Sequence, residues 1–413
     1  MESDTVRWKE KVLRYPLSPN LSFFGSTTTT GGFGSRPTGA ANVATTTTAA
    51  KVTGEQDQEV IPPPNDGVSA LSFSPTADFL AVASWDTFVR IYRIDKSSPQ
   101  PVSPWQQYQH EGPVLDVCWS QDGAKVISGG ADKVARCFDM NTNQSAVVAQ
   151  HNEPIRCVRW CRALGGVLVT GSWDKTVKIW KLDPQPNLVQ TVNLPEKCYA
   201  MDVCGNIVIA AMAERLIIAF AVEENGTLRP IIEQHQSPLK YQTKSVVALP
   251  DGDGYALGGV EGRVAVQYFN DVPDKDGKVK KFAFKCHRRA NADHPDVPRN
   301  ENHLFPVNAI AFNVHGTFAT GGGDGSINFW CKQSRTRLKT FETKGPINAP
   351  KELFKTNPNR LPISAIAFNA DATIFAYAIS YDWHKGYQGA NPENKVYIQP
   401  VNPEDIKKRP PKA

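Results

Sequence analysis

The side chains best suited to chemistry recur together at a fixed spacing. Two sets share the order histidine, threonine, aspartate and tryptophan: His151, Thr170, Asp174 and Trp180, then His303, Thr320, Asp324 and Trp330. A third set has serine as its hydroxyl and ends on a ring without an N–H: His110, Ser128, Asp132 and Phe138. Because the sets recur in repeated segments of the chain, we interpret them as structural and expect no catalytic role for them.

Seven similar segments organise the chain between residues 58 and 403. They start at Val68, Val114, Ile155, Tyr199, Ser245, Val307 and Ile363. Each segment holds alternating, β-branched runs separated by Gly and Asp turns, which is the pattern of strands joined by hairpins. A repeat of roughly 40–45 residues with this pattern is the signature of WD-repeat propellers. The sequence therefore predicts an all-β, seven-bladed WD40 β-propeller over residues 58–403.

WD repeats explain the recurring polar sets. In such folds the aspartate, histidine, hydroxyl and indole N–H form one hydrogen-bonded chain inside a blade. The chain satisfies buried polar groups that would otherwise each cost on the order of 1–3 kcal/mol. We therefore expect both complete sets to form this network, and the set that ends at Phe138 to lack its last donor.

The ends of the chain differ in composition from the repeats. Residues 21–54 are rich in Thr, Gly and Ala and contain Phe-Gly pairs at 23–25 and 32–34. We expect residues 1–57 to form a mostly disordered arm. Residues 404–413 are expected to form a basic tail. Because an open ring exposes strand edges, we expect residues 58–62 to pair with residues 395–400 and close the propeller.

Signatures of other protein classes are absent from the sequence. The run "GGGDG" at 321–325 has no following lysine, and neither G-x-S-x-G nor H-E-x-x-H occurs. The eight cysteines include no C-x-x-C pair, so we expect no metal and no cofactor. No secretory signal and no apolar window of about 18 residues is present, so we expect no membrane contact. We predict a protein that is not an enzyme.

The position before each turn aspartate avoids charge. These positions are Trp85, Ala131, Trp173, Ala213, Val260, Gly323 and Tyr381, with Trp383 close to the last. In a WD propeller these turns open on the top face, so aromatic rings among small residues predict a protein-binding surface there. The alternative is that the rings lie flat against neighbouring loops and bind nothing.

Basic residues gather after the fifth repeat and at the end of the sixth. The segments 275–289 and 330–339 are rich in Lys and Arg, and Phe282 and Phe284 are interleaved with the first. Basic groups neutralise phosphates and aromatic rings stack on bases, so single-stranded RNA is the expected ligand. The alternative is two solvated loop surfaces, and the net charge of +5 permits an anionic partner without requiring one.

Several stretches together resemble one family, the WD-repeat mRNA export factors of the nuclear pore. They are "GPVLDVCWSQDG", "VLVTGSWDKTVKIW", "LPEKCY", "EGRVAVQYFN", "FAFKCHR" and "FAYAISYDWHKG". The resemblance implies a non-enzymatic adaptor in mRNA export whose top face binds the GLEBS hairpin of an FG-repeat nucleoporin. It also implies RNA contact, a monomeric propeller that forms a heterodimer, and a location at the nuclear pore with shuttling to the cytoplasm.

The resemblance also assigns candidate residues. The hairpin surface would comprise Trp85, Trp173, Tyr381 and Trp383. The nucleic-acid groove would comprise Phe284, Lys285, Arg288, Arg289, Trp330, Lys332, Arg335 and Arg337. The nearest alternative is a mitotic checkpoint propeller that binds the same kind of hairpin on kinetochore kinases.

Overall fold

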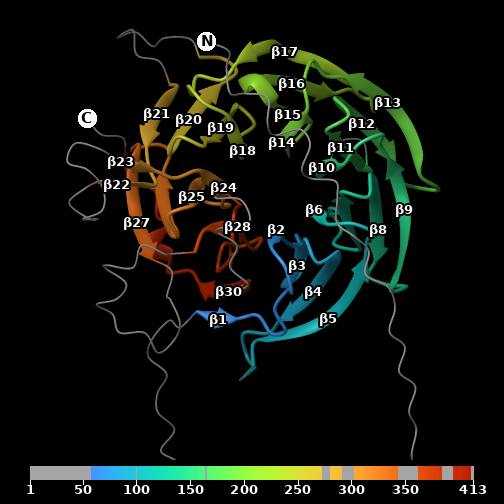
Figure 1. The fold of residues 1–413 in the computed structure, drawn as a ribbon, viewed down its shortest axis with the longest axis horizontal. Helices are drawn as coiled ribbons and strands as arrows, with labels where there is room; N and C mark the ends of the chain where they lie inside the picture. Colours follow the sequence, from blue (N-terminus) through green and yellow to red (C-terminus); the bar gives the residue numbers. More distant parts are fainter. Residues whose placement is uncertain are drawn as a thin grey trace, which may run out of the picture. The chain divides into compact units, whose positions relative to one another are not determined.

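The protein is a ring of antiparallel sheets. The computed structural model describes residues 57–98, 100–162, 165–271, 280–290, 302–342, 361–383 and 394–410. Within these ranges the chain forms seven four-stranded sheets and one two-stranded sheet, with two short 3-10 helices, η2 (Ala213–Arg215) and η5 (Pro403–Asp405). The four-stranded sheets stand around a common centre like the blades of a propeller (Figure 1). The predicted all-β, seven-bladed propeller is confirmed, whereas the predicted disordered arm lies outside the described residues, apart from Asp57.

The first three blades each run from an inner to an outer strand in chain order. Blade one comprises β2 (Val68–Phe73), β3 (Phe79–Ser84), β4 (Phe88–Ile94) and β5 (Val102–Gln109). Blade two comprises β6 (Val114–Trp119), β7 (Lys125–Gly130), β8 (Val134–Asp139) and β9 (Gln144–Gln150). Blade three comprises β10 (Ile155–Cys161), β11 (Val167–Ser172), β12 (Thr176–Lys181) and β13 (Asn187–Asn193).

The next three blades keep the same order, with a hairpin inserted before blade six. Blade four comprises β14 (Cys198–Cys204), β15 (Ile207–Met212), β16 (Leu216–Val222) and β17 (Leu228–Gln236). Blade five comprises β18 (Thr243–Ala248), β19 (Gly254–Gly259), β20 (Arg263–Tyr268) and β21 (Phe282–Lys285). The inserted hairpin comprises β22 (Arg288–Ala290) and β23 (Asn302–Leu304). Blade six comprises β24 (Val307–Phe312), β25 (Thr317–Gly322), β26 (Ser326–Cys331) and β27 (Thr336–Glu342).

Blade seven is built from both ends of the ring. It comprises β28 (Ile363–Phe368), β29 (Ile374–Ile379), β30 (Lys395–Pro400) and, as its outer strand, β1 (Gln58–Glu59). Gln58 pairs with Ile398 and Glu59 with Tyr397, which is the closure expected from the sequence. Asp57 adds a contact to this closing pair of strands, because its carboxylate accepts a hydrogen bond of 2.8 Å from the hydroxyl of Tyr377 on β29.

Apolar side chains fill every interface between neighbouring blades. Seven clusters of buried residues each combine strands of two adjacent blades, such as Cys157 and Val169 of blade three with Met201 and Phe220 of blade four. Strands covered on both faces read as nearly continuous apolar runs, as in "IVIAAM" of β15. The core is therefore divided around the ring, and each blade is held by its two neighbours.

A β-bulge follows the first residue of each inner strand. The register shifts between Val68 and Ala70 in blade one, and at the equivalent place in each of the other six blades. A bulge re-aims the extra side chain. The second residue of every inner strand is therefore the extra residue of the bulge. It lies at one end of the central channel, on the same side as the turns that carry the network aspartates.

The segment after β30 packs onto blade six. The sequence placed residues 404–413 in a basic tail, but Ile406 is buried and its carbonyl accepts a hydrogen bond of 2.9 Å from Thr317. Lys339 of β27 forms an ion pair with Asp405, and the backbone N–H of Arg409 donates to the sulfur of Cys331. Burial of the apolar side chain of Ile406 holds this segment against the blade. We therefore propose that the propeller unit extends to about residue 409.

Candidate functional site

Blade three contains the polar network that the sequence predicted. The carboxylate of Asp174 lies 2.9 Å from Nδ1 of His151, and Nε2 of His151 lies 2.7 Å from the hydroxyl of Thr170. The indole N–H of Trp180 donates to the same hydroxyl at 3.0 Å. Asp174 also accepts from the backbone N–H of Asn152 at the start of the blade. The network thus ties the outer strand of one blade to the turn of the next.

The network is set in one protonation state at neutral pH. Burial lowers the pKa of His151 to about 4, so its imidazole is neutral. Burial alone would raise the pKa of Asp174, but hydrogen bonds from Thr176 and Asn152 outweigh it and lower that pKa. A neutral histidine between a fixed carboxylate and a hydroxyl is a structural clamp, which agrees with the architectural interpretation.

Blade two completes its network with a residue that the sequence prediction missed. His110 contacts Asp132 at 2.9 Å and Ser128 at 2.7 Å. Phe138 has no N–H, and the hydroxyl of Tyr108 donates to Ser128 at 2.9 Å instead. The Tyr108 ring stacks on Phe138 with centroids 5.2 Å apart. The phenol therefore replaces the missing indole, and it comes from β5, the outer strand of blade one.

Blade six uses a different histidine from the predicted one. His287 contacts Asp324 at 2.8 Å and Thr320 at 2.8 Å, and Trp330 donates to Thr320 at 3.0 Å. The prediction of His303 is wrong, because that side chain is exposed on β23 of the inserted hairpin.

The physical reason is the hairpin inserted before blade six. His303 precedes Val307 at the same spacing that separates His110 from Val114, but β22 and β23 separate the true partner, His287, from the inner strand. In both blades the network histidine follows the outer strand of the preceding blade: His110 follows β5, and His287 follows β21. This position after an outer strand is the feature of the sequence that could have identified His287.

Three of the four predicted top-face aromatics form one cluster. The rings of Trp85 and Trp383 stack at 6.3 Å and 19°, and Tyr381 lies 5.9 Å from Trp383. They come from the turns of blades one and seven, which are neighbours in the ring. Trp85 is 40% exposed and Trp383 is 42% exposed. Two large rings thus stand together, half open to solvent, on one side of the top face.

Trp173 lies apart from this cluster, on blade three. Its side chain is half-buried, and its Nε1 is buried without a hydrogen-bond partner. A buried N–H that lacks an acceptor costs about 1–3 kcal/mol. The sequence left two alternatives for Trp173, a ring packed against neighbouring loops or a ring that binds a partner. The half-buried ring fits the first, and the indole N–H without an acceptor leaves a donor for the second.

Two cations at the channel mouth were not recognised from the sequence. Arg156 and Lys244 are the second residues of β10 and β18, where the bulge re-aims the side chain. Arg156 donates to the carbonyl of Leu115 at 3.2 Å. Burial lowers the pKa of Lys244, which the charge of Asp382 partly offsets and that of Arg156 reinforces. A basic residue at the second position of an inner strand is the feature of the sequence that could have identified these two cations.

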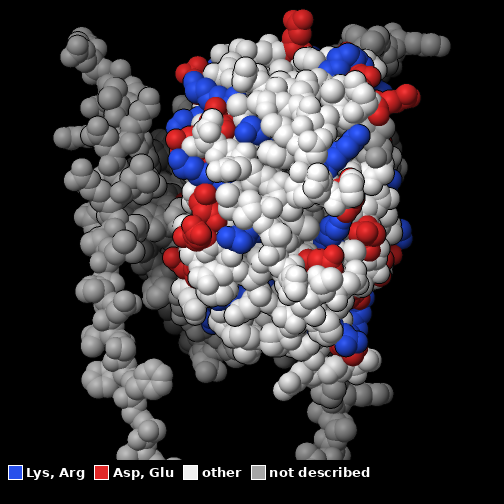
Figure 2. Space-filling model, turned by 90° about the vertical axis from the view of Figure 1, so that its right-hand side faces the viewer, with Lys and Arg blue, Asp and Glu red and all other residues white. Residues whose placement is uncertain are grey.

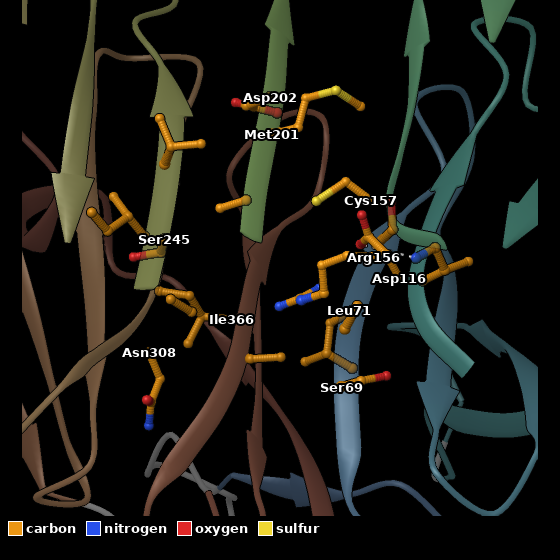
Figure 3. Close-up of a pocket in the computed structure, with 18 of the residues that line it drawn as sticks. Ser69, Leu71, Asp116, Arg156, Cys157, Met201, Asp202, Ser245, Asn308 and Ile366 are labelled. Atoms are coloured by element: carbon orange, nitrogen blue, oxygen red, sulfur yellow. Dashed lines mark hydrogen bonds between the residues drawn. The ribbon is translucent and has the colours of Figure 1, made fainter. Parts of the chain in front are cut away.

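Arg159 lies on the third blade's inner strand further along the channel, and it is neutralised. Its guanidinium lies 2.5 Å from Asp116 and 3.0 Å from Asp202. Both carboxylates also accept backbone N–H groups, from Val158 and Ala248. The channel has a volume of about 350 Å³ and is lined by the inner strands (Figure 3). Charge inside the channel is thus paired between blades two, three and four.

The predicted nucleic-acid residues lie on the outer edges of blades five and six. Lys285 on β21 and Arg337 on β27 are exposed. Arg335 is exposed, and its guanidinium lies 4.8 Å from the centre of the Phe282 ring. Lys332 and Lys280 both lie over Tyr268, at 5.6 and 6.0 Å. We call these residues, Tyr268, Lys280, Phe282, Lys285, Lys332, Arg335 and Arg337, the basic edge.

Other residues predicted for the groove are engaged inside the fold. Trp330 is only 9% exposed, contacts Phe284 at 4.4 Å and belongs to the blade-six network, so its ring is closed to a base. Arg288 donates to the carbonyls of Glu261 and Gly262. Lys332 forms an ion pair with Asp251, and the side chain of Arg289 lies outside the described part of the structure. Base stacking at this edge would fall to Phe282 and Tyr268.

The outer edge of blades two and three carries no comparable concentration of charge. Figure 2 faces the side of the molecule where β9 and β13 lie, and there Lys and Arg are scattered among Asp and Glu over a largely uncharged surface. Blade three has the pair of Lys178 over Trp180 at 5.8 Å, whereas several cation–ring contacts lie together at the edge of blades five and six.

The chain is similar to known proteins over most of its length. Residues 298–331 match the family "WD domain, G-beta repeat", and residues 71–163 match "Anaphase-promoting complex subunit 4 WD40 domain". The Poly(A)+ RNA export protein of Schizosaccharomyces pombe is 43% identical over 377 residues, or 90% of this chain and 98% of that protein. The chain belongs to the family of mRNA export propellers.

Further members of this mRNA export family show the same extent of similarity. The mRNA export factor GLE2 of Chaetomium thermophilum is 42% identical over 86% of this chain and 93% of its own length. The mRNA export factor of Danio rerio is 41% identical over 92% and 96%. The similarity spans the propeller, and the relatives support a role in mRNA export and an association with export machinery.

Two kinds of feature are absent from the described ranges. No helix there is long and apolar enough to cross a membrane. Among the same residues, no group of three or more His, Cys, Asp and Glu side chains is placed to hold a metal ion.

Proposed function

We propose that the protein is a non-enzymatic adaptor in mRNA export. Its top face docks on the GLEBS hairpin of an FG-repeat nucleoporin, and its basic edge contacts RNA of the exported particle. The stacked pair of Trp85 and Trp383 is the observation that carries the proposal, because half-exposed tryptophans on one face supply the anchors that dominate protein interfaces. The protein acts at the nuclear pore and shuttles to the cytoplasm.

The channel mouth adds charge complementarity to the top face. Burial disfavours the charge of Lys244, and the carboxylate of Asp382 favours that charge more strongly than Arg156 opposes it. An acidic side chain of the partner would add a second favourable charge beside Lys244 when the interface excludes water. We therefore expect an amphipathic hairpin with apolar residues against the tryptophan pair and a carboxylate at the channel mouth.

Calorimetric titration of the full chain with a GLEBS hairpin peptide tests the docking site. Wild-type protein should bind, and Trp85→Ala should weaken binding by about 2 kcal/mol or more. Trp105→Ala is the matched control, because Trp105 is 46% exposed but lies on the outer strand β5, away from the top face. Equal affinity of the two variants would contradict the docking site, and no binding by wild type would contradict the hairpin partner.

RNA contact rests on a different observation, the exposed cations beside aromatic rings at the basic edge. The exposed side chains of Arg335 and Lys280 lie over the rings of Phe282 and Tyr268 and supply phosphate-binding groups at this edge. Binding of a single-stranded RNA oligonucleotide should weaken as salt increases. Affinity independent of salt would contradict phosphate contact at this edge.

The alternative function, a mitotic checkpoint scaffold, shares the top face and differs in the partner. Purification of the tagged chain from cells distinguishes the two. Recovery of nucleoporins supports the export adaptor, whereas recovery of kinetochore kinases without nucleoporins would replace it with the scaffold.

A further inference from the structure

Three sulfur atoms meet where blade three packs on blade four. A Cβ atom placed on Gly171 would lie 2.7 Å from Sγ of Cys198 and 3.5 Å from Sδ of Met201. Cys157 is the direct partner of Gly171 across the β10–β11 pair. Since such partners hold their Cβ positions roughly 4.5–5.5 Å apart, Cys157 borders the same small space. The Sγ atom of Cys198 also lies 3.8 Å from the carbonyl oxygen of Ala200, and all three side chains belong to one buried cluster.

The equivalent positions of the other blades carry no such cluster. At the place of Cys198 the other inner strands have Val68, Val114, Ile155, Thr243, Val307 and Ile363. At the place of Cys157 they have Ala70, Asp116, Ala200, Ser245, Ala309 and Ala365. Packing at this level of a blade therefore requires small or aliphatic groups, and it does not require sulfur. Sulfur at both positions of one interface is a separate feature that the propeller fold does not explain.

We propose that Cys157, Cys198 and Met201 form a binding site for a soft monovalent metal ion, and that Cu(I) is the ion that fits it. Thiolate and thioether donors select Cu(I) among the first-row metals. Zinc sites use thiolate, imidazole and carboxylate donors, so the thioether of Met201 argues against zinc. Binding replaces the thiol protons, so the two thiols release protons as the ion is taken up.

The surroundings favour such an ion in two ways. The guanidinium of Arg156 lies near Cys157 and would offset the net negative charge of two thiolates around one monovalent cation, whereas Arg159 is already paired with Asp116 and Asp202. Cys157 and Met201 also lie on the wall of the central channel (Figure 3), which offers an entry path to an otherwise buried cluster. A bound ion would tie β10 of blade three to β14 of blade four.

Competition with a Cu(I)-specific chelator tests the site. The full chain, reduced without added thiols and kept free of oxygen, is titrated against the Cu(I) complex of bathocuproine disulfonate, whose absorbance reports the copper that remains. Wild-type protein should withdraw one Cu(I) per chain. Cys157→Ser should lose this uptake, and Met201→Leu, which keeps the volume of the side chain, should weaken it by about tenfold.

Cys286→Ser is the matched control, because Cys286 is a buried thiol of similar size in blade five and its removal should leave uptake unchanged. Thermal unfolding of each variant without copper establishes that it is folded. With Cu(I) the midpoints of wild type and Cys286→Ser should rise, whereas that of Cys157→Ser should not. Uptake that is absent from wild type, or equal in Cys157→Ser and Cys286→Ser, would overturn the proposal. A Cys157–Cys198 disulfide that forms in place of copper uptake would overturn it as well.

Discussion

The top face and the basic edge hold their aromatic rings in opposite ways. On the top face Trp85 and Trp383 are each about half open to solvent and stack on one another. At the edge Trp330 is buried, and the accessible rings of Phe282 and Tyr268 are already covered by cations. Apolar area that is still exposed can stabilise a complex when a partner covers it, whereas ring faces occupied by lysine and arginine leave charge as the main attraction. The two surfaces therefore suit different classes of partner.

The largest expected effect is loss of hairpin affinity when the tryptophan pair is broken. The double variant Trp85→Ala with Tyr381→Ala removes the rings on either side of Trp383, and it should lower affinity for the hairpin by about 3 kcal/mol or more. RNA affinity should stay unchanged, because neither ring reaches the basic edge. Calorimetry with both ligands checks this, and a parallel loss of RNA binding would show that the two surfaces are not separate.

A charge reversal at the channel mouth should have the next largest effect. Lys244→Glu places a carboxylate where we expect the partner's acidic side chain, so hairpin affinity should fall by about 2 kcal/mol. Lys244→Met keeps the length of the side chain and should cost less. If both variants bind like wild type, the mouth lies outside the interface and only the tryptophan pair anchors the hairpin.

The salt dependence of RNA binding should separate the edge from the rest of the surface. Lys285→Glu combined with Arg337→Glu should weaken RNA binding and reduce the slope of log affinity against log salt by about 1–2. The control variant reverses charge at exposed Lys181 on β12 and at Lys178 on the same strand, so it has the same net charge. An equal change in the control would mean that the total charge of the protein, and no particular edge, governs binding.

The pH dependence should be smaller and confined to the edge. Burial, a hydrogen bond that the protonated carboxyl donates to Asp251, and repulsion by Asp251 together raise the pKa of Asp253 to about 6. Below that pH the carboxyl is neutral, so a negative charge near Lys332 and Tyr268 disappears and RNA binding should strengthen by a few-fold between pH 7 and 5. Asp253→Asn should bind more tightly at pH 7 and show a flatter profile. A profile unchanged by this substitution would place the RNA elsewhere.

Trp173 should produce the smallest effect and the most specific one. Trp173→Phe keeps an aromatic ring and deletes the indole N–H that lacks a partner, so unfolding of the free protein should become slightly less favourable or stay unchanged. Weaker hairpin binding by this variant would show that the partner supplies an acceptor. Unchanged binding would make Trp173 part of the blade packing alone, and chemical denaturation supplies the stability readout.

The repeats allowed the fold to be predicted because each blade carries its own local signals. Alternating runs, turn residues and the set of His151, Thr170, Asp174 and Trp180 identify a blade without reference to the others. The closing pair of β1 and β30 was predictable because an open edge must be covered. These features depend on sequence spacing within one or two segments, which a single sequence displays directly.

Features that depend on insertions or on several blades at once were missed. His303 has the expected spacing to Val307, but the inserted hairpin moves the role to His287, and spacing alone cannot distinguish the two. Trp330 fits both a network and a nucleic-acid groove by residue type, and only its burial against Phe284 separates them. Tyr108 replaces an indole from a strand of the preceding blade, and Arg156 and Lys244 come from blades three and five, so both features depend on packing between blades.

Simultaneous binding of the two ligands tests most directly whether the protein is an adaptor with two separate surfaces. A fluorescently labelled single-stranded RNA is titrated with the full chain, alone and in the presence of a saturating amount of the GLEBS hairpin peptide. We predict the same RNA affinity in both titrations and a ternary complex of RNA, propeller and hairpin by analytical ultracentrifugation. Displacement of the RNA by the hairpin would contradict the separation of the top face from the basic edge.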